Sequence, residues 1–241
     1  MLIDLHAHTK GISRCCQIPA PDVLREAKAV GLDGIVLTNH YQESYLNGGS
    51  CEEFVERYIS EYEYAKELGG QMGMKVFFGV EVTANFWPSI HLLIYGVDAG
   101  FLRKYPRLYD YSLEELYEIV RANDCALVQA HPFRNGCHVL DTDFLDGLEI
   151  NCHPLYGKSY QQELEEAARA AGLILTCGGD FHADTYRPHC GVYLPDWVQT
   201  DCDLAKFILT ADEVTLHVQE VNDPAHQDRH YVLPRAEKYL K

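Results

Sequence analysis

The chain has 241 residues, of which 47% are hydrophobic, and its 20 Lys and Arg against 36 Asp and Glu give a formal net charge of −16. This acidity argues against a nucleic-acid polymer or an anionic membrane as partner, because proteins bind both through basic patches. It leaves room for a small anionic substrate, since bound divalent metals can reverse the local sign of charge. The length and the apolar fraction suit a globular protein with a sizeable core.

Cysteine usage and the N-terminus favour a reducing compartment. The nine cysteines are odd in number and scattered without a CxxC pair, which is not typical of a disulfide framework. The first residues, Met1-Leu2-Ile3-Asp4, lack the basic and long apolar regions of a signal peptide, and no run approaches membrane-spanning length. We therefore expect a cytoplasmic protein without a membrane anchor.

Short apolar runs alternate with amphipathic segments. Strands are expected over residues 2–8, 34–38, 75–82, 90–95, 126–130, 147–151 and 173–177, and helices over 21–30, 52–68, 112–123 and 160–171. The pair Gly69-Gly70 is the expected stop of the second helix, and Ser112 with Glu115 forms a capping-box pattern at the start of the third. A helix near 204–209 and a strand near 214–218 follow, and the tail from Asn222 is expected to be irregular.

This alternation predicts an α/β fold with parallel strands and helical crossovers. Seven main strands are close to the number in a closed, TIM-like barrel, and an open doubly wound sheet is the alternative. The absence of a GxGxxG or Walker phosphate loop weakens the nucleotide-binding form of that alternative. We expect a single domain over residues 1–241, with 196–241 as a C-terminal extension packed on the barrel.

Side chains that commonly bind metals stand at the ends of these runs. They are His6, His8, His40, Glu81, His91, His131, Asp180 and His182. His6 and His8 are two residues apart, so a strand presents both on one face, and Asp180 and His182 repeat that spacing. A lone histidine such as His40 is more often structural, and His91 is the weaker candidate because it starts its run. Parallel strands nevertheless end at one mouth, where imidazoles and carboxylates together indicate a transition-metal cluster.

The motifs resemble, in order, those of the PHP (polymerase and histidinol phosphatase) domain family over about residues 1–195. They are Asp4-Leu5-His6-Ala7-His8-Thr9, Thr38-Asn39-His40, Gly79-Val80-Glu81, His91-Leu92-Leu93, His131-Pro132-Phe133 and Gly179-Asp180-Phe181-His182. The resemblance implies a PHP-type domain with a distorted seven-stranded (β/α) barrel. It also implies a centre of two or three divalent transition metals (Zn, Mn or Fe) that hydrolyses phosphoric esters.

The resemblance also implies a role for each ligand. His6, His8 and Asp180 would hold the first metal, and Glu81 would bridge it to a second. His91 and His131 would complete the second site with Glu81, while His40 and His182 would serve the remaining one.

Two departures from the family pattern bear on the third site. The segment from Lys10 to Cys16 lacks the Asp or His that many members carry there, and Asn39 stands where Asp often precedes the histidine. Cys16 could substitute as a soft ligand. The favoured interpretation is that Cys15 and Cys16 are ordinary loop thiols.

The expected reaction is attack of a metal-bound hydroxide, next to Glu81, on a small phosphate ester such as a phosphomonoester or a nucleotide-like compound. His182 is a candidate proton donor, and His153 a candidate for lining the substrate pocket. A guanidinium matches phosphate oxygens, which makes Arg14, Arg134 and Arg187 candidates for binding them.

Two other functions stay open at this point. The first is a C–N hydrolase of the amidohydrolase type, which also uses an HxH pair after the first strand. A buried lysine ligand after a middle strand would favour it, and none is visible, since Lys75 starts a strand. The second is a non-catalytic metal-binding module.

Overall fold

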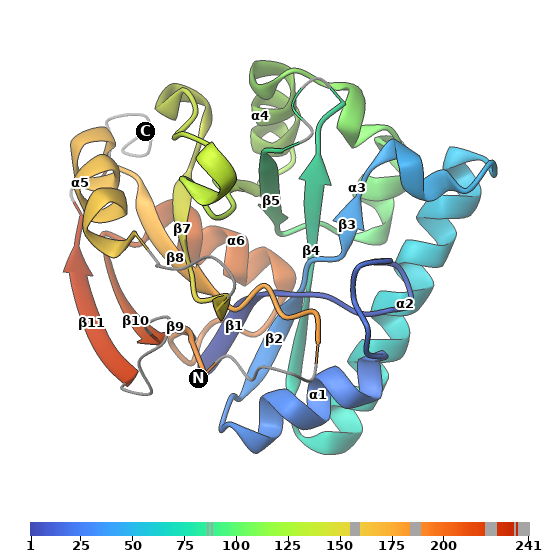
Figure 1. The fold of residues 1–241 in the computed structure, drawn as a ribbon, viewed down its shortest axis with the longest axis horizontal. Coiled ribbons are helices and arrows are strands. Elements are labelled where there is room, and N and C mark those ends of the chain that lie inside the picture. Colours follow the sequence, from blue (N-terminus) through green and yellow to red (C-terminus); the bar gives the residue numbers. More distant parts are fainter. Residues whose placement is uncertain are drawn as a thin grey trace.

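The strands of this mixed α/β protein form one sheet that is nearly closed into a barrel (Figure 1). The structure is a computed structural model, and it describes residues 1–85, 87, 89–154, 160–183, 189–219, 226–233 and 235. Ten of the described strands follow one path, β11-β10-β9-β1-β2-β4-β5-β6-β7-β8, and β3 pairs with β4 beside it. Their bounds are β1 (Leu2–Ala7), β2 (Gly34–Leu37), β3 (His40–Tyr41), β4 (Lys75–Thr83), β5 (His91–Tyr95), β6 (Ala126–Gln129), β7 (Gly147–Asn151), β8 (Ile174–Gly178), β9 (Gly191–Tyr193), β10 (Glu213–Gln219) and β11 (His226–Val232).

The prediction of a seven-stranded barrel is therefore wrong in strand number. The seven expected strands are all present as β1, β2 and β4 to β8, but β9 pairs antiparallel with the first half of β1 and carries β10 and β11 beyond it. The tail predicted to be irregular thus supplies β11 over residues 226–232. The division into a barrel and an extension from residue 196 stays a prediction.

The two ends of the barrel part meet between β1 and the segment after β8. An isolated parallel bridge joins Ala7 to Phe181, and the His8 N–H donates to the Phe181 carbonyl at 3.2 Å. The Gly179 N–H donates to Asp4 Oδ1 at 2.9 Å. These bonds place the residues after β8 directly beside the end of β1.

One strand of the barrel part, β5, runs against its neighbours. It pairs antiparallel with both β4 and β6, and the Thr83–His91 pair lies next to the short connection between β4 and β5. The amino end of β5 consequently lies with the carboxyl ends of the other strands. His91, at the start of its strand, therefore reaches the mouth of the barrel.

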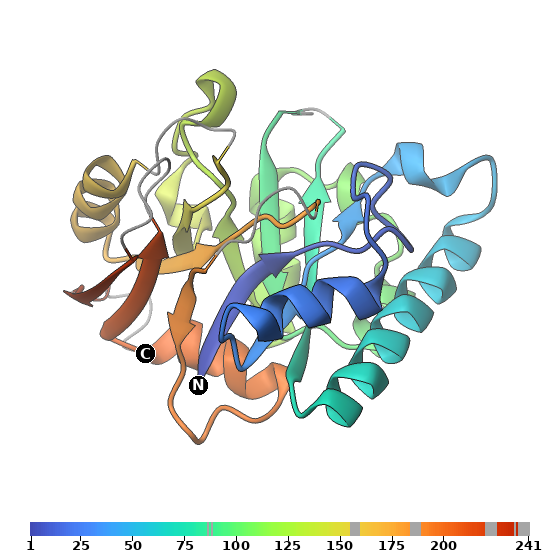
Figure 2. The same cartoon turned by 60° about the horizontal axis from the view of Figure 1, so that its bottom comes forward.

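Helices surround the sheet (Figure 1). They are α1 (Ala20–Ala29), α2 (Cys51–Met72), α3 (Ala99–Lys104), α4 (Leu113–Ala122), α5 (Gln161–Ala171) and α6 (Asp201–Thr210). The short 3-10 helices are η1 (Glu43–Leu46), η2 (Leu108–Asp110), η3 (Arg134–Gly136) and η4 (Thr142–Phe144). Figure 2 shows α6 running along the lower end of the strands, where Asp201 Oδ1 accepts a hydrogen bond of 2.7 Å from the Phe78 N–H.

Two helix ends test the capping patterns predicted from the sequence. The predicted capping box of Ser112 and Glu115 is confirmed at the start of α4. The predicted stop of α2 at Gly69-Gly70 is wrong, because the helix continues to Gly73, whose φ of 71° forms a left-handed cap. Gly69 instead permits close packing on β4, since a Cβ there would lie 2.6 Å from Val76 Cγ2.

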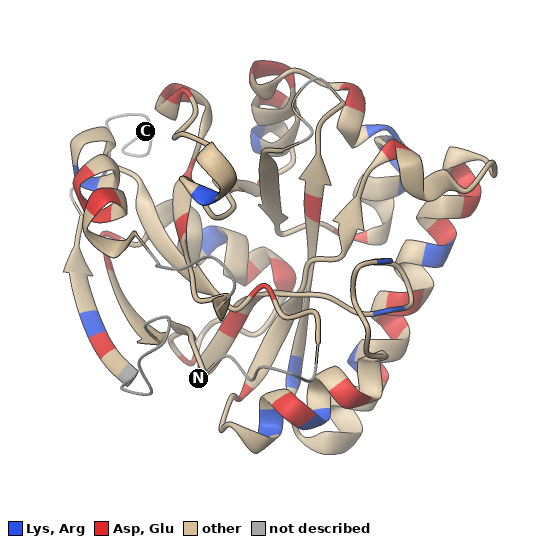
Figure 3. Cartoon of the chain, viewed as in Figure 1, with Lys and Arg blue, Asp and Glu red and all other residues tan. Residues whose placement is uncertain are grey.

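Charge is distributed as expected for an acidic protein with an apolar core. Acidic residues outnumber Lys and Arg on the outer helices α2, α4 and α5 (Figure 3). No helix in the described ranges combines the length and apolarity needed to cross a bilayer. Against this pattern, the carboxyl groups of Asp4, Glu81, Glu149 and Asp180 are buried. Glu81, Glu149 and Asp180 belong to the site described next.

Candidate metal centre

The mouth of the barrel gathers all eight side chains that the sequence analysis nominated as metal ligands. Six of them are buried, and His91 and His182 are partly exposed. Their ligand atoms fall into overlapping groups in which all atoms lie within 4.8 Å of one another. These groups are His6–His8–Asp180, His6–Glu81–His131, His40–Glu81–His91 and His8–His40–His182. The geometry thus brings the set together, while its role as a ligand set stays a proposal.

The hydrogen-bond network assigns protons to the imidazoles of His6 and His8. His6 Nδ1 lies 2.8 Å from a Glu149 carboxylate oxygen, which can only accept, so Nδ1 carries the hydrogen. The Ser13 hydroxyl donates to Asn39 Oδ1 at 2.8 Å, so it accepts from His8 Nδ1 at 3.0 Å. Both Nε2 atoms are left with lone pairs in the neutral form, yet they face each other at 3.1 Å.

Carboxylate oxygens converge on the same point. Asp180 Oδ1 lies 3.1 Å from His8 Nε2 and 3.4 Å from His6 Nε2, and Glu81 Oε1 lies 3.3 Å from His6 Nε2. Four electron-pair donors at these distances repel one another unless a cation, either a metal ion or a proton, neutralises them. The donor set is therefore suited to a cation at this point.

Glu81 occupies the middle of the cluster and offers one oxygen to each side. Its Oε1 lies 2.8 Å from His91 Nδ1 and 3.1 Å from His131 Nε2. Its Oε2 lies 2.5 Å from His40 Nδ1, but both of these buried atoms lack hydrogen-bond geometry. Such a contact without a hydrogen bond is what two ligands of a common cation would show. A carboxylate so placed can bridge two cations, which a single imidazole nitrogen cannot.

The electrostatics of the side chains likewise favour positive charge in the cluster. Burial opposes ionisation of Glu81, but His40, His91 and His6 outweigh it and hold the carboxyl pKa well below its usual value. Burial lowers the pKa of the His40 imidazole, but Glu81 and Cys15 outweigh it and raise that pKa to about 10. His8 differs, because burial and the neighbouring histidines His182 and His40 lower its pKa well below the usual value.

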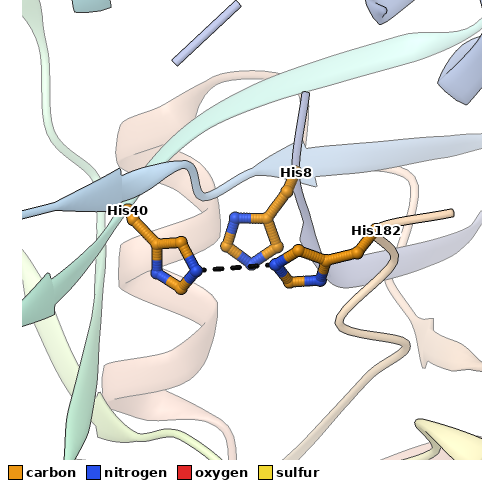
Figure 4. A group of neighbouring side chains, drawn as sticks. All are labelled: His8, His40 and His182. Atoms are coloured by element: carbon orange, nitrogen blue, oxygen red, sulfur yellow. Dashed lines mark hydrogen bonds between the residues drawn. The ribbon is translucent and has the colours of Figure 1, made fainter. Parts of the chain in front are cut away.

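The fourth group, His8–His40–His182, includes the partly exposed His182. Figure 4 shows the imidazoles of His8, His40 and His182 turned toward one another. His182 Nδ1 lies 2.7 Å from the Asp180 carbonyl oxygen, which places a hydrogen on Nδ1, and His182 Nε2 lies 3.5 Å from His40 Nε2. Three imidazoles therefore offer nitrogen ligands to one position, from the residue after β1, from β3 and from the segment after β8.

Glu149 of β7 holds much of this centre in place and was not among the residues predicted from the sequence. Its Oε1 accepts from His6 Nδ1, and its Oε2 accepts from the His131 N–H at 2.9 Å and from Asn151 Nδ2 at 3.1 Å. The side chain has no exposed surface. The available signal was an acidic residue inside the apolar run Gly147–Asn151, where a charge needs partners.

Ser13 and Asn39 also hold the histidines in place, through hydrogen bonds. Ser13 Oγ accepts from His8 Nδ1 and from the His40 N–H at 3.0 Å. Asn39 Oδ1 accepts from Ser13 and from the Thr9 N–H, at 2.8 Å in both cases. Asn39 thus acts on the segment after His8 and, through Ser13, on the histidines. Its uncharged amide oxygen accepts both of these hydrogen bonds.

The two loop cysteines differ from each other. Burial raises the pKa of the Cys15 thiol, but hydrogen bonds with His182 and His40 outweigh it and lower the pKa to about 6. Cys16 Sγ lies 3.5 Å from the Ile18 carbonyl oxygen, and burial raises its pKa to about 12. The thiol beside the histidines therefore belongs to Cys15, whereas the sequence analysis considered Cys16.

Of the substrate-binding candidates, Arg134 and His153 lie at the centre. Arg134 Nη1 is 3.0 Å from Asp180 Oδ2, and the His153 ring centroid is 6.4 Å from that of His182. Burial lowers the pKa of His153 to about 4, so its imidazole is neutral at neutral pH. Arg14 instead donates to the Ser44 carbonyl oxygen at 2.8 Å. Arg187 lies outside the described residues.

The segment that carries Arg134 has an unusual backbone. His131, Phe133 and Asn135 have φ values of 32°, 71° and 51°, and Asp180 across the mouth has a φ of 49°. Left-handed backbone is uncommon for residues with a Cβ, costs about 1–3 kcal/mol each, and is concentrated at functional sites. Two of these residues, His131 and Asp180, are proposed ligands, and Phe133 and Asn135 flank Arg134.

Comparisons with known proteins identify the fold. No family model and no curated protein matches the chain. The crystal structure of PsfC from Pseudomonas syringae PB-5123 matches with a TM-score of 0.61 and 18% identity, over 99% of this chain and 94% of that one. A protein from Bifidobacterium adolescentis described as a "putative metal-dependent phosphoesterase" matches with a TM-score of 0.53 and 17% identity, over 86% of this chain and 95% of that one. An amidohydrolase from Chromobacterium violaceum, with bound sulfate and no metal, matches with a TM-score of 0.57 and 16% identity, over 86% of this chain and 97% of that one. At these identities the likeness establishes that this chain shares the fold found in such hydrolases.

Proposed function

We propose that the chain is a metal-dependent phosphoesterase that hydrolyses a small phosphate ester. The observation that carries this proposal is the convergence of His6 Nε2, His8 Nε2 and the oxygens of Asp180 and Glu81 on one point, with the Arg134 guanidinium beside them. The description of the Bifidobacterium adolescentis protein as a "putative metal-dependent phosphoesterase" supports it.

The residues fit two or three divalent transition metals such as Zn, Mn or Fe, because imidazole nitrogens and carboxylate oxygens are their usual ligands. His6, His8 and Asp180 would hold the first ion, Glu81 would bridge to a second held by His91 and His131, and His40 with His182 would hold a third. Bound there, such ions would lower the pKa of water and neutralise the charge of phosphoryl oxygens.

The chain's own residues would orient the substrate. Arg134 is a partly exposed guanidinium that can turn from Asp180 Oδ2 toward a phosphate and bind two of its oxygens. Neutral His153 can donate a hydrogen bond to the ester. The pKa of His182 is raised, because Cys15 and Asp180 outweigh its burial, so it can protonate the leaving oxygen when it is not a ligand.

A C–N hydrolase is the second candidate, favoured by the likeness to the Chromobacterium violaceum amidohydrolase. Neither Lys75 nor Lys104 supports it. Lys75 lies at the opposite end of β4 from Glu81 and donates to Gln199 Oε1 at 2.6 Å, and Lys104 lies over the Tyr105 ring. Neither could act as a bridging ligand in the mouth.

The test is phosphate release from an aryl phosphate, beside hydrolysis of a matched anilide, by the metal-free full-length chain and after addition of Mn²⁺ or Zn²⁺. We expect metal-dependent phosphate release that a chelator abolishes. His8→Ala and Asp180→Ala should fold, bind less metal and lose hydrolysis, whereas His230→Ala, at a largely exposed position on β11, should behave as wild type. Anilide hydrolysis alone would favour the second candidate, and metal binding without either reaction would favour a non-catalytic module.

The substrate is expected to be a small phosphorylated anion, because a net charge of −16 disfavours a nucleic-acid polymer or an anionic membrane. A cytoplasmic location stays a prediction.

A further inference from the structure

Three buried cysteines form a second cluster, separate from the histidines. They are Cys152 after β7, Cys177 in β8 and Cys190 before β9, and their sulfur atoms all lie within 4.8 Å of one another. We propose that this cluster is a thiolate site for a soft d10 cation such as Zn²⁺ or Cu⁺. The proposal is independent of the function of the histidine centre.

The cluster lies on the opposite face of β7 and β8 from the histidine centre. A Cβ on Gly178 would contact His6 and Glu149, so Gly178 faces the centre and its neighbour Cys177 faces away. Cys177 Sγ lies 3.6 Å from the carbonyl oxygen of His217 on β10. The three thiols therefore lie between the barrel strands and the added strands β9 and β10.

The spacing of the thiols matches a metal–thiolate site. Cys152 Sγ and Cys177 Sγ are 3.7 Å apart. A zinc–sulfur bond of ~2.3 Å puts two sulfur ligands roughly 3.8 Å apart in a tetrahedral site and about 4.0 Å apart in a trigonal one. The cation could thus be bound with only small movements of these side chains.

The chemistry of the pocket selects a soft cation. Cys177 and Cys190 have no exposed surface and Cys152 has 4%, so hard cations would lack the water ligands they prefer. No described His, Asp or Glu joins the group. A divalent ion would displace one proton from each thiol and form a complex with a net charge of −1, because ligation requires the thiolate.

Such a site would stabilise the segments that carry His153 and Asp180 in the histidine centre. Cys152 precedes His153, and Cys177 lies three residues before Asp180. A cation bound to the three sulfur atoms would fix the carboxyl ends of β7 and β8 against the segment that leads to β9.

The experiment is a Cd²⁺ titration of the metal-free, reduced full-length chain. Cd²⁺ bound by thiolates gives a sulfur-to-metal charge-transfer band in the ultraviolet, which nitrogen and oxygen ligands do not give. All variants would carry Cys15→Ala, which removes the thiol beside the histidines, and His8→Ala would be added in one arm to weaken that centre. We expect one equivalent of Cd²⁺ to produce the band in both backgrounds.

Cys177→Ala should abolish the band, and Cys125→Ala, a buried cysteine outside the cluster, should leave it intact. Circular dichroism would show whether each variant folds, and Cys190→Ala provides a second removal. Cadmium NMR of the chain with all three cysteines gives a reading without their removal, because sulfur-only ligation shifts the resonance far downfield. The proposal would be overturned if the band were absent, or if it persisted in folded Cys177→Ala. It would also be overturned if the chain took up no Cd²⁺ and its intact mass after mild oxidation showed a Cys152–Cys177 disulfide.

Discussion

Glu149→Gln tests how the proposed metal ligands are oriented, because it replaces a hydrogen-bond acceptor with a donor while the side chain keeps nearly the same shape. The carboxylate accepts at both oxygens, from His6 Nδ1 on one side and from the His131 N–H and Asn151 Nδ2 on the other. A glutamine keeps one acceptor oxygen and replaces the other with an NH₂ donor. The backbone N–H of His131 cannot change its role, so the amide oxygen must face His131 and Asn151.

The NH₂ group of the glutamine must then face His6 Nδ1, which can accept only if its hydrogen moves to Nε2. That tautomer points an N–H at Asp180 Oδ1 and removes the lone pair that would bind a metal. The loss of one oriented ligand should weaken metal binding by roughly 10–100-fold, or about 1.4–2.7 kcal/mol, which is the usual effect of removing a partner of a ligating histidine.

The assay is metal titration against a competing chelator, with nitrogen NMR of the imidazoles to report the His6 tautomer. Glu115→Gln, the same substitution at an exposed helix cap, is the control and should leave metal affinity unchanged. Glu149→Gln with wild-type affinity and the hydrogen still on His6 Nδ1 would refute the reasoning.

Three further substitutions test the surroundings of the centre. Burial raises the pKa of Asp4 to about 7 against two backbone hydrogen bonds, so in the metal-free chain its contribution to stability is greatest below its usual value of 3.8 and declines as pH rises through about 7. Asp4→Asn should flatten this slope in urea unfolding, and an unchanged slope would contradict the assignment. Arg134→Gln should lower kcat/KM for a phosphate ester about 10–100-fold by removing ~1.5–3 kcal/mol of charged hydrogen bonding, with metal content unchanged; a change in metal content alone would argue for a structural role. Gly178→Ala places a Cβ 2.4 Å from His6 Cβ and should cost about 1–3 kcal/mol in denaturant unfolding, whereas Gly70→Ala, with open space, should not; equal effects would exclude the steric explanation.

The ligand set could be predicted because its signals are local in the chain. A buried strand that ends in His6-Ala7-His8 puts both imidazoles on one face, and the carboxyl ends of parallel strands share one edge. His91 was ranked as the weaker candidate because its strand was assumed to run parallel to the others. The connection between β4 and β5 covers only residues 84–90, too short for a crossover, which requires about a dozen residues or more. That length indicates a hairpin and brings His91 to the mouth.

The parts that escaped prediction depend on contacts between distant segments. Glu149 could be recognised as a buried charge from its strand, but its partners, His6 and His131, become neighbours only when the sheet curves. The pairing of β9 with the first half of β1 is equally non-local, since residues 2 and 193 are partners. A barrel of seven strands therefore followed from the local pattern, and the path of ten did not.

Protons and metals compete for the same positions in this centre. Burial opposes a charge on His6, yet Glu149, Glu81 and Asp180 raise its pKa well above the usual value, and Glu81 with Cys15 does the same for His40. In the metal-free chain these imidazolium groups would supply the positive charge that the carboxylates require. The stabilisation from His40 is then complete below its unfolded pKa of 6.5 and is lost as pH rises through about 10. Above that range only a metal could balance the negative charge of the buried carboxylates. At neutral pH a metal must displace protons to bind, so metal affinity rises with pH. The same buried carboxylates that attract metal ions would therefore hold protons on the imidazoles when the metals are absent.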